Sequence, residues 1–86
     1  MDVIFLGYKD IANFHTDDGK VIDGIKVFFT FESFDNNYSG FEVGHWFIDR
    51  SKSDLISKVN SFKPLENVTL SLASNGKRTY FTDINK

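Results

Sequence analysis

The sequence predicts a mainly β domain in which five strands close into a small barrel and one helix lies between the third and fourth strands. Two aromatic, β-rich runs at 25–32 and 41–48 flank a turn-rich segment, which is the pattern of a hairpin with a longer loop. Residues 51–62 carry an apolar stripe at helical spacing. Asn75-Gly76, a strong hairpin signal, separates two further β-rich runs. The predicted order is therefore three strands, a helix and two strands.

The first strand is predicted at Val3–Tyr8, where apolar side chains fall on both faces. A strand that is apolar on both faces is central in its sheet or sits where a barrel closes. Residues 11–14 can extend this strand past a bend. Residues 15–20 contain Asp-Asp-Gly and form a turn.

The second strand, at 25–32, has one apolar and one polar face because side chains alternate along a strand. The inward face consists of Ile25, Val27, Phe29 and Phe31, and the outward face consists of Lys26, Phe28, Thr30 and Glu32. Phe28 is the exception, since it is an aromatic ring on an otherwise polar face. An exposed ring flanked by Lys26 and Thr30 is the first indication of a binding surface.

The third strand, at 41–48, has no clean apolar face. Gly44 indicates either a β-bulge or a close approach of the backbone to a neighbouring group. A bulge would switch the facing of the side chains midway along the strand. Either Trp46 or Phe47 is therefore expected to be at least partly exposed, and periodicity does not decide which.

The helix at 51–62 presents its apolar stripe to the sheet and ends at Lys63-Pro64. This stripe consists of Leu55, Ile56, Val59 and Phe62 and is predicted to be core.

A two-residue loop at Asn75-Gly76 sets the register predicted for the last hairpin. It pairs Leu72 with Thr79 and Leu70 with Phe81 on the inward face. Ala73 then pairs with Arg78, and Ser71 with Tyr80, on the outward face. The outward face is thus expected to carry Arg78 and Tyr80, with Lys77 at the tip.

The composition indicates one small cytoplasmic domain over residues 1–86. There is no cysteine, which excludes disulfides and thiolate metal sites, and the two histidines lie far apart without acidic clusters. We therefore expect no metal and no cofactor. No apolar run reaches the length of a membrane span, and no signal peptide is recognisable. No spacing of a catalytic motif is present, so we expect a binding protein and not an enzyme.

The predicted order of elements is that of an OB-fold, a five-stranded Greek-key barrel that binds oligonucleotides or oligosaccharides. The alternatives are an SH3-like barrel and a mixed α+β sheet with one packed helix. Three segments, Asp-Gly-Lys at 18–20, Lys-Val-Phe-Phe at 26–29 and Asn-Gly-Lys-Arg at 75–78, are similar to segments of small OB-like proteins of phages and mobile elements that bind single-stranded DNA. The chain resembles that family in architecture, and the resemblance implies a dimer.

Binding of single-stranded DNA or RNA with little sequence specificity is the function that the residues favour. Aromatic rings stack on bases, and nearby cations hold the backbone. The candidate platforms are Phe28, Trp46 and Tyr80, and the candidate phosphate contacts are Lys26, Lys77 and Arg78.

The charge balance departs from that expectation and supports an alternative. Ten basic and twelve acidic residues give a net charge of −2, whereas a nucleic-acid binder usually carries a basic excess. Exposed rings on a small domain also mark subunit or partner interfaces. A protein–protein interaction module or inhibitor, or a homodimer, would use the same aromatic surface.

Overall fold

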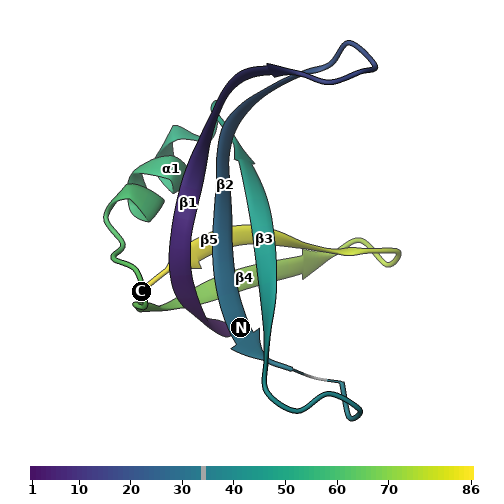
Figure 1. The fold of residues 1–86 in the computed structure, drawn as a ribbon, viewed down its shortest axis with the longest axis vertical. Coiled ribbons are helices and arrows are strands. Elements are labelled where there is room, and N and C mark those ends of the chain that lie inside the picture. Colours follow the sequence, from purple (N-terminus) through teal and green to yellow (C-terminus); the bar gives the residue numbers. More distant parts are fainter. Residues whose placement is uncertain (34) are drawn as a thin grey trace.

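The computed structural model describes residues 1–33 and 35–86, which form five strands and one helix (Figure 1). The helix α1 lies between the third and fourth strands, as predicted. The elements are β1 (Asp2–His15), β2 (Val21–Glu32), β3 (Phe41–Asp49), α1 (Ser53–Asn60), β4 (Asn67–Ser74) and β5 (Thr79–Asn85).

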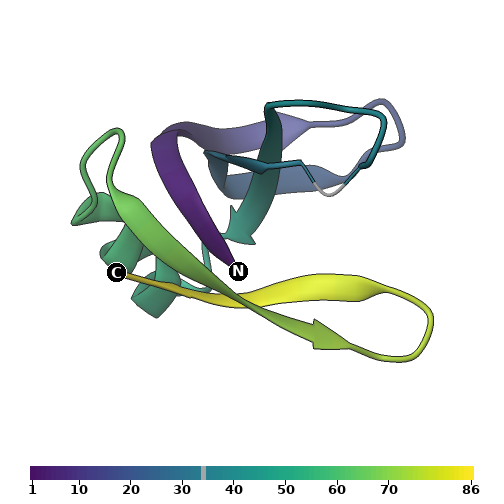
Figure 2. The same cartoon turned by 90° about the horizontal axis from the view of Figure 1, so that it is seen from below.

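The strands form one antiparallel sheet in the order β3-β2-β1-β4-β5. The sheet bends so that β1–β3 make one layer and the β4–β5 hairpin makes a second layer below it (Figure 2). The prediction of a mainly β fold with one helix is confirmed. The predicted closure is not seen, because β3 and β5 remain the two edges of the sheet over the described ranges.

The long strand β1 covers both segments that the sequence indicated, and it bends between them. Its pairing with β2 shifts register between Phe5 and Gly7 and again between Ile11 and Phe14. Asn13, within the second shift, has a positive φ of 50°. The bends carry the β1–β2 ribbon away from the body of the molecule (Figure 1).

The core lies between the two layers, where the inward face of β2 meets β5 and α1. The prediction for β2 is confirmed, because Ile25, Val27 and Phe29 are buried and Phe31 is half-buried. The Phe29 ring meets Phe81 of β5 edge-on, with 5.5 Å between the ring centroids. The other buried core residues are Val3, Phe5, Ile48, Val59, Phe62, Val68, Leu70 and Ile84.

The apolar stripe of α1 packs on this core as predicted. Val59 and Phe62 are buried, and Leu55 and Ile56 pack against them. The Phe62 ring contacts Phe5 of β1 edge-on, at 5.6 Å between the centroids. The helix therefore covers one end of the space between the layers.

The pairing of β3 with β2 is regular from Phe41 to Asp49, so Gly44 does not form a bulge. The other explanation for Gly44, a close approach of the backbone to a neighbouring group, is confirmed, because a Cβ atom on Gly44 would lie 2.6 Å from the ring carbon Cε2 of Phe29. Regular alternation turns Trp46 inward, where its ring lies 5.6 Å from that of Phe81. Phe47 faces outward.

The register predicted for the last hairpin is wrong. The structure pairs Ser74 with Thr79 and Leu72 with Phe81, and the pairing shifts again between Ser71 and Leu72. The loop therefore spans residues 75–78. The Asn75 side-chain oxygen accepts hydrogen bonds from the backbone N–H groups of Lys77, at 3.1 Å, and Arg78, at 3.0 Å. This local bonding takes the Arg78 N–H away from the ladder, and the Arg78 carbonyl still accepts a hydrogen bond from the Asn75 N–H, at 3.3 Å, across the base of the loop.

Gly24 of β2 is required by the backbone of β3. A Cβ atom there would collide with the carbonyl oxygen of Ile48, which is main chain and cannot rotate away. We expect Gly24→Ala to destabilise the fold by about 1–3 kcal/mol, the usual cost of overpacking. Urea unfolding followed by circular dichroism measures this. Thr82→Ala, at an exposed position of β5, is the control. Equal unfolding midpoints for the two variants would contradict the placement of Gly24.

Ion pairs join the elements at the surface. The Arg50 guanidinium contacts Asp10 at 2.5 Å and Asp23 at 3.1 Å, which ties the end of β3 to β1 and β2. Hydrogen bonds to these two carboxylates raise the pKa of Arg50. Lys58 of α1 contacts Asp83 of β5 at 2.8 Å, and hydrogen bonds from Lys58 and from the Ile84 N–H lower the pKa of Asp83.

The lowered pKa of Asp83 makes stability depend on pH in the acid range. Its folded pKa lies below the unfolded value of about 3.9, so the stabilisation is present above that pH and is lost as pH falls through the folded pKa. We expect the urea midpoint to fall below about pH 4 and to fall less in Asp83→Asn. Asp17→Asn is the control, because Asp17 has no ion pair in the described chain. An acid dependence that the two variants change equally would contradict this role.

Candidate functional site

The solvent-facing side of the β1–β3 layer carries an unusual number of rings and aliphatic side chains for an exposed sheet face. We call it the outer face. It is the side opposite the buried Ile25, Val27 and Phe29. Its members include Ile4, Lys9, Ile11 and Phe14 of β1, Ile22, Lys26, Phe28, Thr30 and Glu32 of β2, and Phe41, Val43, His45 and Phe47 of β3.

Strand register places Lys26 at the centre of the outer face. Lys26 pairs with Phe47 of β3 on one side and with Lys9 of β1 on the other. Its Nζ atom lies 5.6 Å from the centroid of the Phe28 ring, within cation–π range. Two lysines and two rings therefore share one patch across three strands.

Glycine makes room for the Phe47 ring. A Cβ atom on Gly24 would lie 2.9 Å from the ring carbon Cζ of Phe47, so the ring lies over the bare backbone of β2. Phe47 is 36% exposed in this position. The ring is thus supported from below and keeps contact with solvent, as a stacking platform requires.

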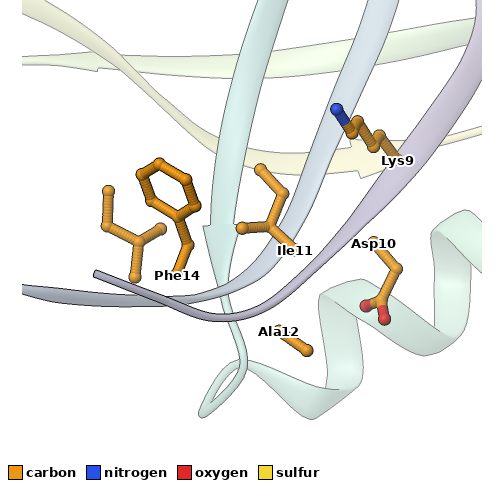
Figure 3. Close-up of a pocket in the computed structure, with 6 residues that line it drawn as sticks. Lys9, Asp10, Ile11, Ala12 and Phe14 are labelled. Atoms are coloured by element: carbon orange, nitrogen blue, oxygen red, sulfur yellow. The ribbon is translucent and has the colours of Figure 1, made fainter. Parts of the chain in front are cut away.

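A hollow of about 460 Å³ extends the outer face toward the β1–β2 ribbon. Figure 3 shows the side chains of Ile11 and Phe14 on one side of β1, with Asp10 on the opposite side. Ile11 and Ile22 also line a neighbouring hollow together with Lys26, His45 and Phe47. The two hollows share Ile11 and Ile22; Lys9 and Asp10 also line the first hollow, and Lys26 lines the second.

Ion pairs and strand register limit the negative charge at the centre of this patch, although the chain as a whole has a net charge of −2. Asp10 and Asp23 are held by Arg50, and Asp83 is held by Lys58. Glu32 stands at the far end of the outer face, opposite Phe41. In the described ranges neither Lys9 nor Lys26 has an ion-pair partner.

The structure divides the six predicted site residues among three places. Lys26 and Phe28 lie together on the outer face. Trp46 faces the interior, half-buried against Phe81, so the exposed ring of β3 is Phe47.

The three remaining residues, Lys77, Arg78 and Tyr80, belong to the β4–β5 hairpin. Tyr80 follows the alternation of β5: because Phe81 points into the core, Tyr80 points away from the β1–β3 layer. Tyr80 is 46% exposed. The hairpin residues and the outer face are therefore two separate surfaces.

Sequence reasoning missed Lys9, Phe14 and Phe41 as members of the outer face. Phe41 is 60% exposed and Phe14 is 57% exposed. Alternation along the sequence puts Phe41 and Phe47 on one face of the strand, and the burial of Ile48 in the structure shows that this face points outward. The signal for Lys9 was weaker, because the register shifts in β1 change which of its residues face outward.

Three further observations bear on function. In the described part of the chain, His, Asp and Glu side chains form no cluster of three that could hold a metal ion. No helix among the described residues has the length and apolar character needed to cross a membrane. Comparison with known proteins finds no family model, no curated protein and no solved structure that matches this chain.

Proposed function

We propose that the outer face binds single-stranded nucleic acid with little sequence specificity. The observation that carries the proposal is the central patch, in which Lys26 lies between Lys9 and Phe47 and against the Phe28 ring. Phe47 is exposed and Phe28 is half-buried, and neither lysine has an ion-pair partner among the described residues. Rings that contact solvent and alternate with such cations on a sheet face are the elements of a single-strand binding surface. The strand order and the position of α1 support an OB-like arrangement, a fold that presents such a face.

Each residue of the patch has a distinct role in this proposal. Phe28 and Phe47 stack on bases, at roughly 1–3 kcal/mol for each base. Lys9 and Lys26 contact phosphates. Phe47 replaces Trp46 as the stacking platform on β3, because the Trp46 ring faces the interior and packs against Phe81.

The hairpin residues Lys77, Arg78 and Tyr80 have a lesser role. They lie on the other layer, so one short oligonucleotide on the outer face does not reach them. They can contact a longer strand that wraps around the edge of the molecule. We therefore assign the primary site to the outer face and expect the hairpin to contribute only with long ligands.

Fluorescence anisotropy of a labelled oligo-dT tests the proposal. Saturable binding is expected at low salt. Two phosphate contacts predict that log K falls with log salt at a slope of about −1.4, from roughly −0.7 for each contact on a single strand. Duplex DNA of the same length is the control and is expected to bind more weakly, since its bases are not available for stacking. Equal affinity for duplex and single strand, or no binding at low salt, would refute the proposal.

A protein partner is the second candidate function, and the apolar end of β3 favours it. Val43 is 70% exposed and lies beside Phe41 on the outer face. Adjacent exposed apolar side chains of this kind mark protein interfaces. The anisotropy experiment separates the two candidates, because a surface dedicated to a protein partner would not bind oligo-dT in a salt-dependent manner.

A further inference from the structure

Strand β3 has a backbone edge that no other strand covers within residues 1–33 and 35–86. Two backbone bonds fix the alternation of its hydrogen bonds: Ser33 N–H donates to the Gly40 carbonyl at 3.0 Å, and Arg50 N–H donates to the Asp23 carbonyl at 2.9 Å. Both pairs continue the β2–β3 register. In an antiparallel ladder every second residue bonds to the partner strand. The even-numbered residues of β3 therefore bond to β2, and the odd-numbered residues point their N–H and C=O groups to the open edge.

Among the described residues, contacts occupy both ends of this edge and leave its middle free. At one end the Phe41 carbonyl accepts a hydrogen bond from the Tyr38 hydroxyl at 2.9 Å. At the other end the Asp49 carbonyl accepts one from the Lys52 N–H at 2.9 Å. Val43, His45 and Phe47 lie between, and we call these three residues the free window. Their backbone groups have no partner within residues 1–33 and 35–86.

The free window has the properties of a pairing template. The strand is regular from Phe41 to Asp49 and contains no proline, lysine or bulge, which are three of the devices that protect an edge; its inward-facing charge, Glu42, lies outside the free window. The opposite edge differs, because Lys58 of α1 reaches across to Asp83 and Asn85 at the end of β5. One edge of the sheet is thus open and the other is partly covered.

We propose that a second copy of this chain pairs with β3 along the free window. The two strands run antiparallel about a two-fold axis that passes through His45. In this register Val43 bonds to Phe47 of the second copy, and His45 bonds to His45 of the second copy. It is the symmetric register that satisfies all three residues of the free window in both copies, with six backbone hydrogen bonds.

The side chains fit the same register. On the outer face Val43 lies beside Phe47 of the second copy, an aliphatic–aromatic cross-strand pair of the favourable kind. On the inner side Gly44 lies opposite Trp46 of the second copy and offers no side chain to clash with it. Glu42 lies opposite Ile48, so no carboxylate faces another. This self-complementarity favours a second copy over an unrelated peptide as the occupant.

The pairing would join the outer faces of the two copies, three strands from each, into one continuous surface across six strands. Because a two-fold interface uses the same edge of both copies, assembly ends at the dimer. The inference does not depend on nucleic-acid binding. A dimer that ignores oligo-dT and a monomer that binds it are separate, recognisable results.

Sedimentation equilibrium of the full chain tests the pairing with two edge variants. Val43→Pro removes one outward N–H, and proline is tolerated on the solvent side of an edge strand. We expect the wild type to sediment as a dimer and Val43→Pro as a monomer with a preserved circular dichroism spectrum.

The second variant keeps the test valid if the proline unfolds the strand. His45→Lys places two lysines opposite each other at the axis and should weaken the dimer by about tenfold or more. His15→Lys, the same change in the β1–β2 ribbon, is the matched control and should leave the dimer intact. A wild type that stays monomeric as concentration rises, or a dimer that His45→Lys and His15→Lys weaken equally, would overturn the proposal.

Discussion

Replacement of Phe29 by alanine is expected to lower the free energy of unfolding by about 3–5 kcal/mol, a typical cost for deleting a buried aromatic ring. Phe29 is 1% exposed and packs edge-on against Phe81 between the two layers. Since a domain of this size is stabilised by only about 5–15 kcal/mol, the variant should unfold at a much lower urea concentration. Urea unfolding followed by circular dichroism gives the difference.

Phe28→Ala is the matched control, because the same substitution one residue earlier falls on the outer face. Phe28 is half-buried and touches Lys26, not the core. We expect a loss of less than about 1 kcal/mol, in the range of a surface change that also removes a cation–π contact. Equal losses at the two positions would show that the assignment of the two faces of β2 is wrong.

Lys26→Glu is expected to reduce the affinity for oligo-dT by about tenfold or more, equivalent to 1.4 kcal/mol. The substitution removes the cation at the centre of the patch and places a carboxylate between Phe47 and Lys9. The slope of log K against log salt should become shallower by roughly 0.7, since one phosphate contact is lost. Anisotropy titrations at several salt concentrations measure both quantities.

Lys77→Glu makes the same change of charge in the loop of the β4–β5 hairpin. With an oligonucleotide too short to wrap around the molecule, this variant should bind nearly as tightly as the wild type. The reverse result, in which Lys77→Glu abolishes binding and Lys26→Glu does not, would move the site from the outer face to the hairpin.

Local patterns predicted the elements whose environment is simple. The alternation in β2 is unambiguous because Ile25, Val27 and Phe29 are all apolar and their neighbours are mostly polar. The stripe of α1 was equally clear. In both elements one face is buried and the other is exposed to solvent, so the periodicity of apolar residues in the sequence matches the packing.

The last hairpin could not be placed in register from its sequence. Asn75-Gly76 favours a two-residue loop, but the Asn75 side chain bonds to the N–H groups of Lys77 and Arg78 and stabilises a longer one. A second shift, between Ser71 and Leu72, moves the pairing further. Competition between side-chain and ladder hydrogen bonds is a tertiary outcome that a turn motif does not encode.

Only part of the candidate site could be predicted from the sequence, because pairing between strands decides which other residues join it. Lys26 and Phe28 share one strand, so alternation alone brings them together. Lys9 joins them only because β1 pairs beside β2 after its first register shift. Phe47 joins them because Gly44 approaches Phe29 without a bulge, which keeps β3 regular and turns Trp46 inward.

Amide chemical shifts during titration with a short oligo-dT test most directly whether the outer face holds the strand. The account predicts that the largest changes map to β2 around Lys26 and Phe28 and to β3 around Phe47, with little change in residues 75–80. Changes centred on the hairpin loop and Tyr80, or no changes in β2 and β3 at saturating ligand, would contradict it.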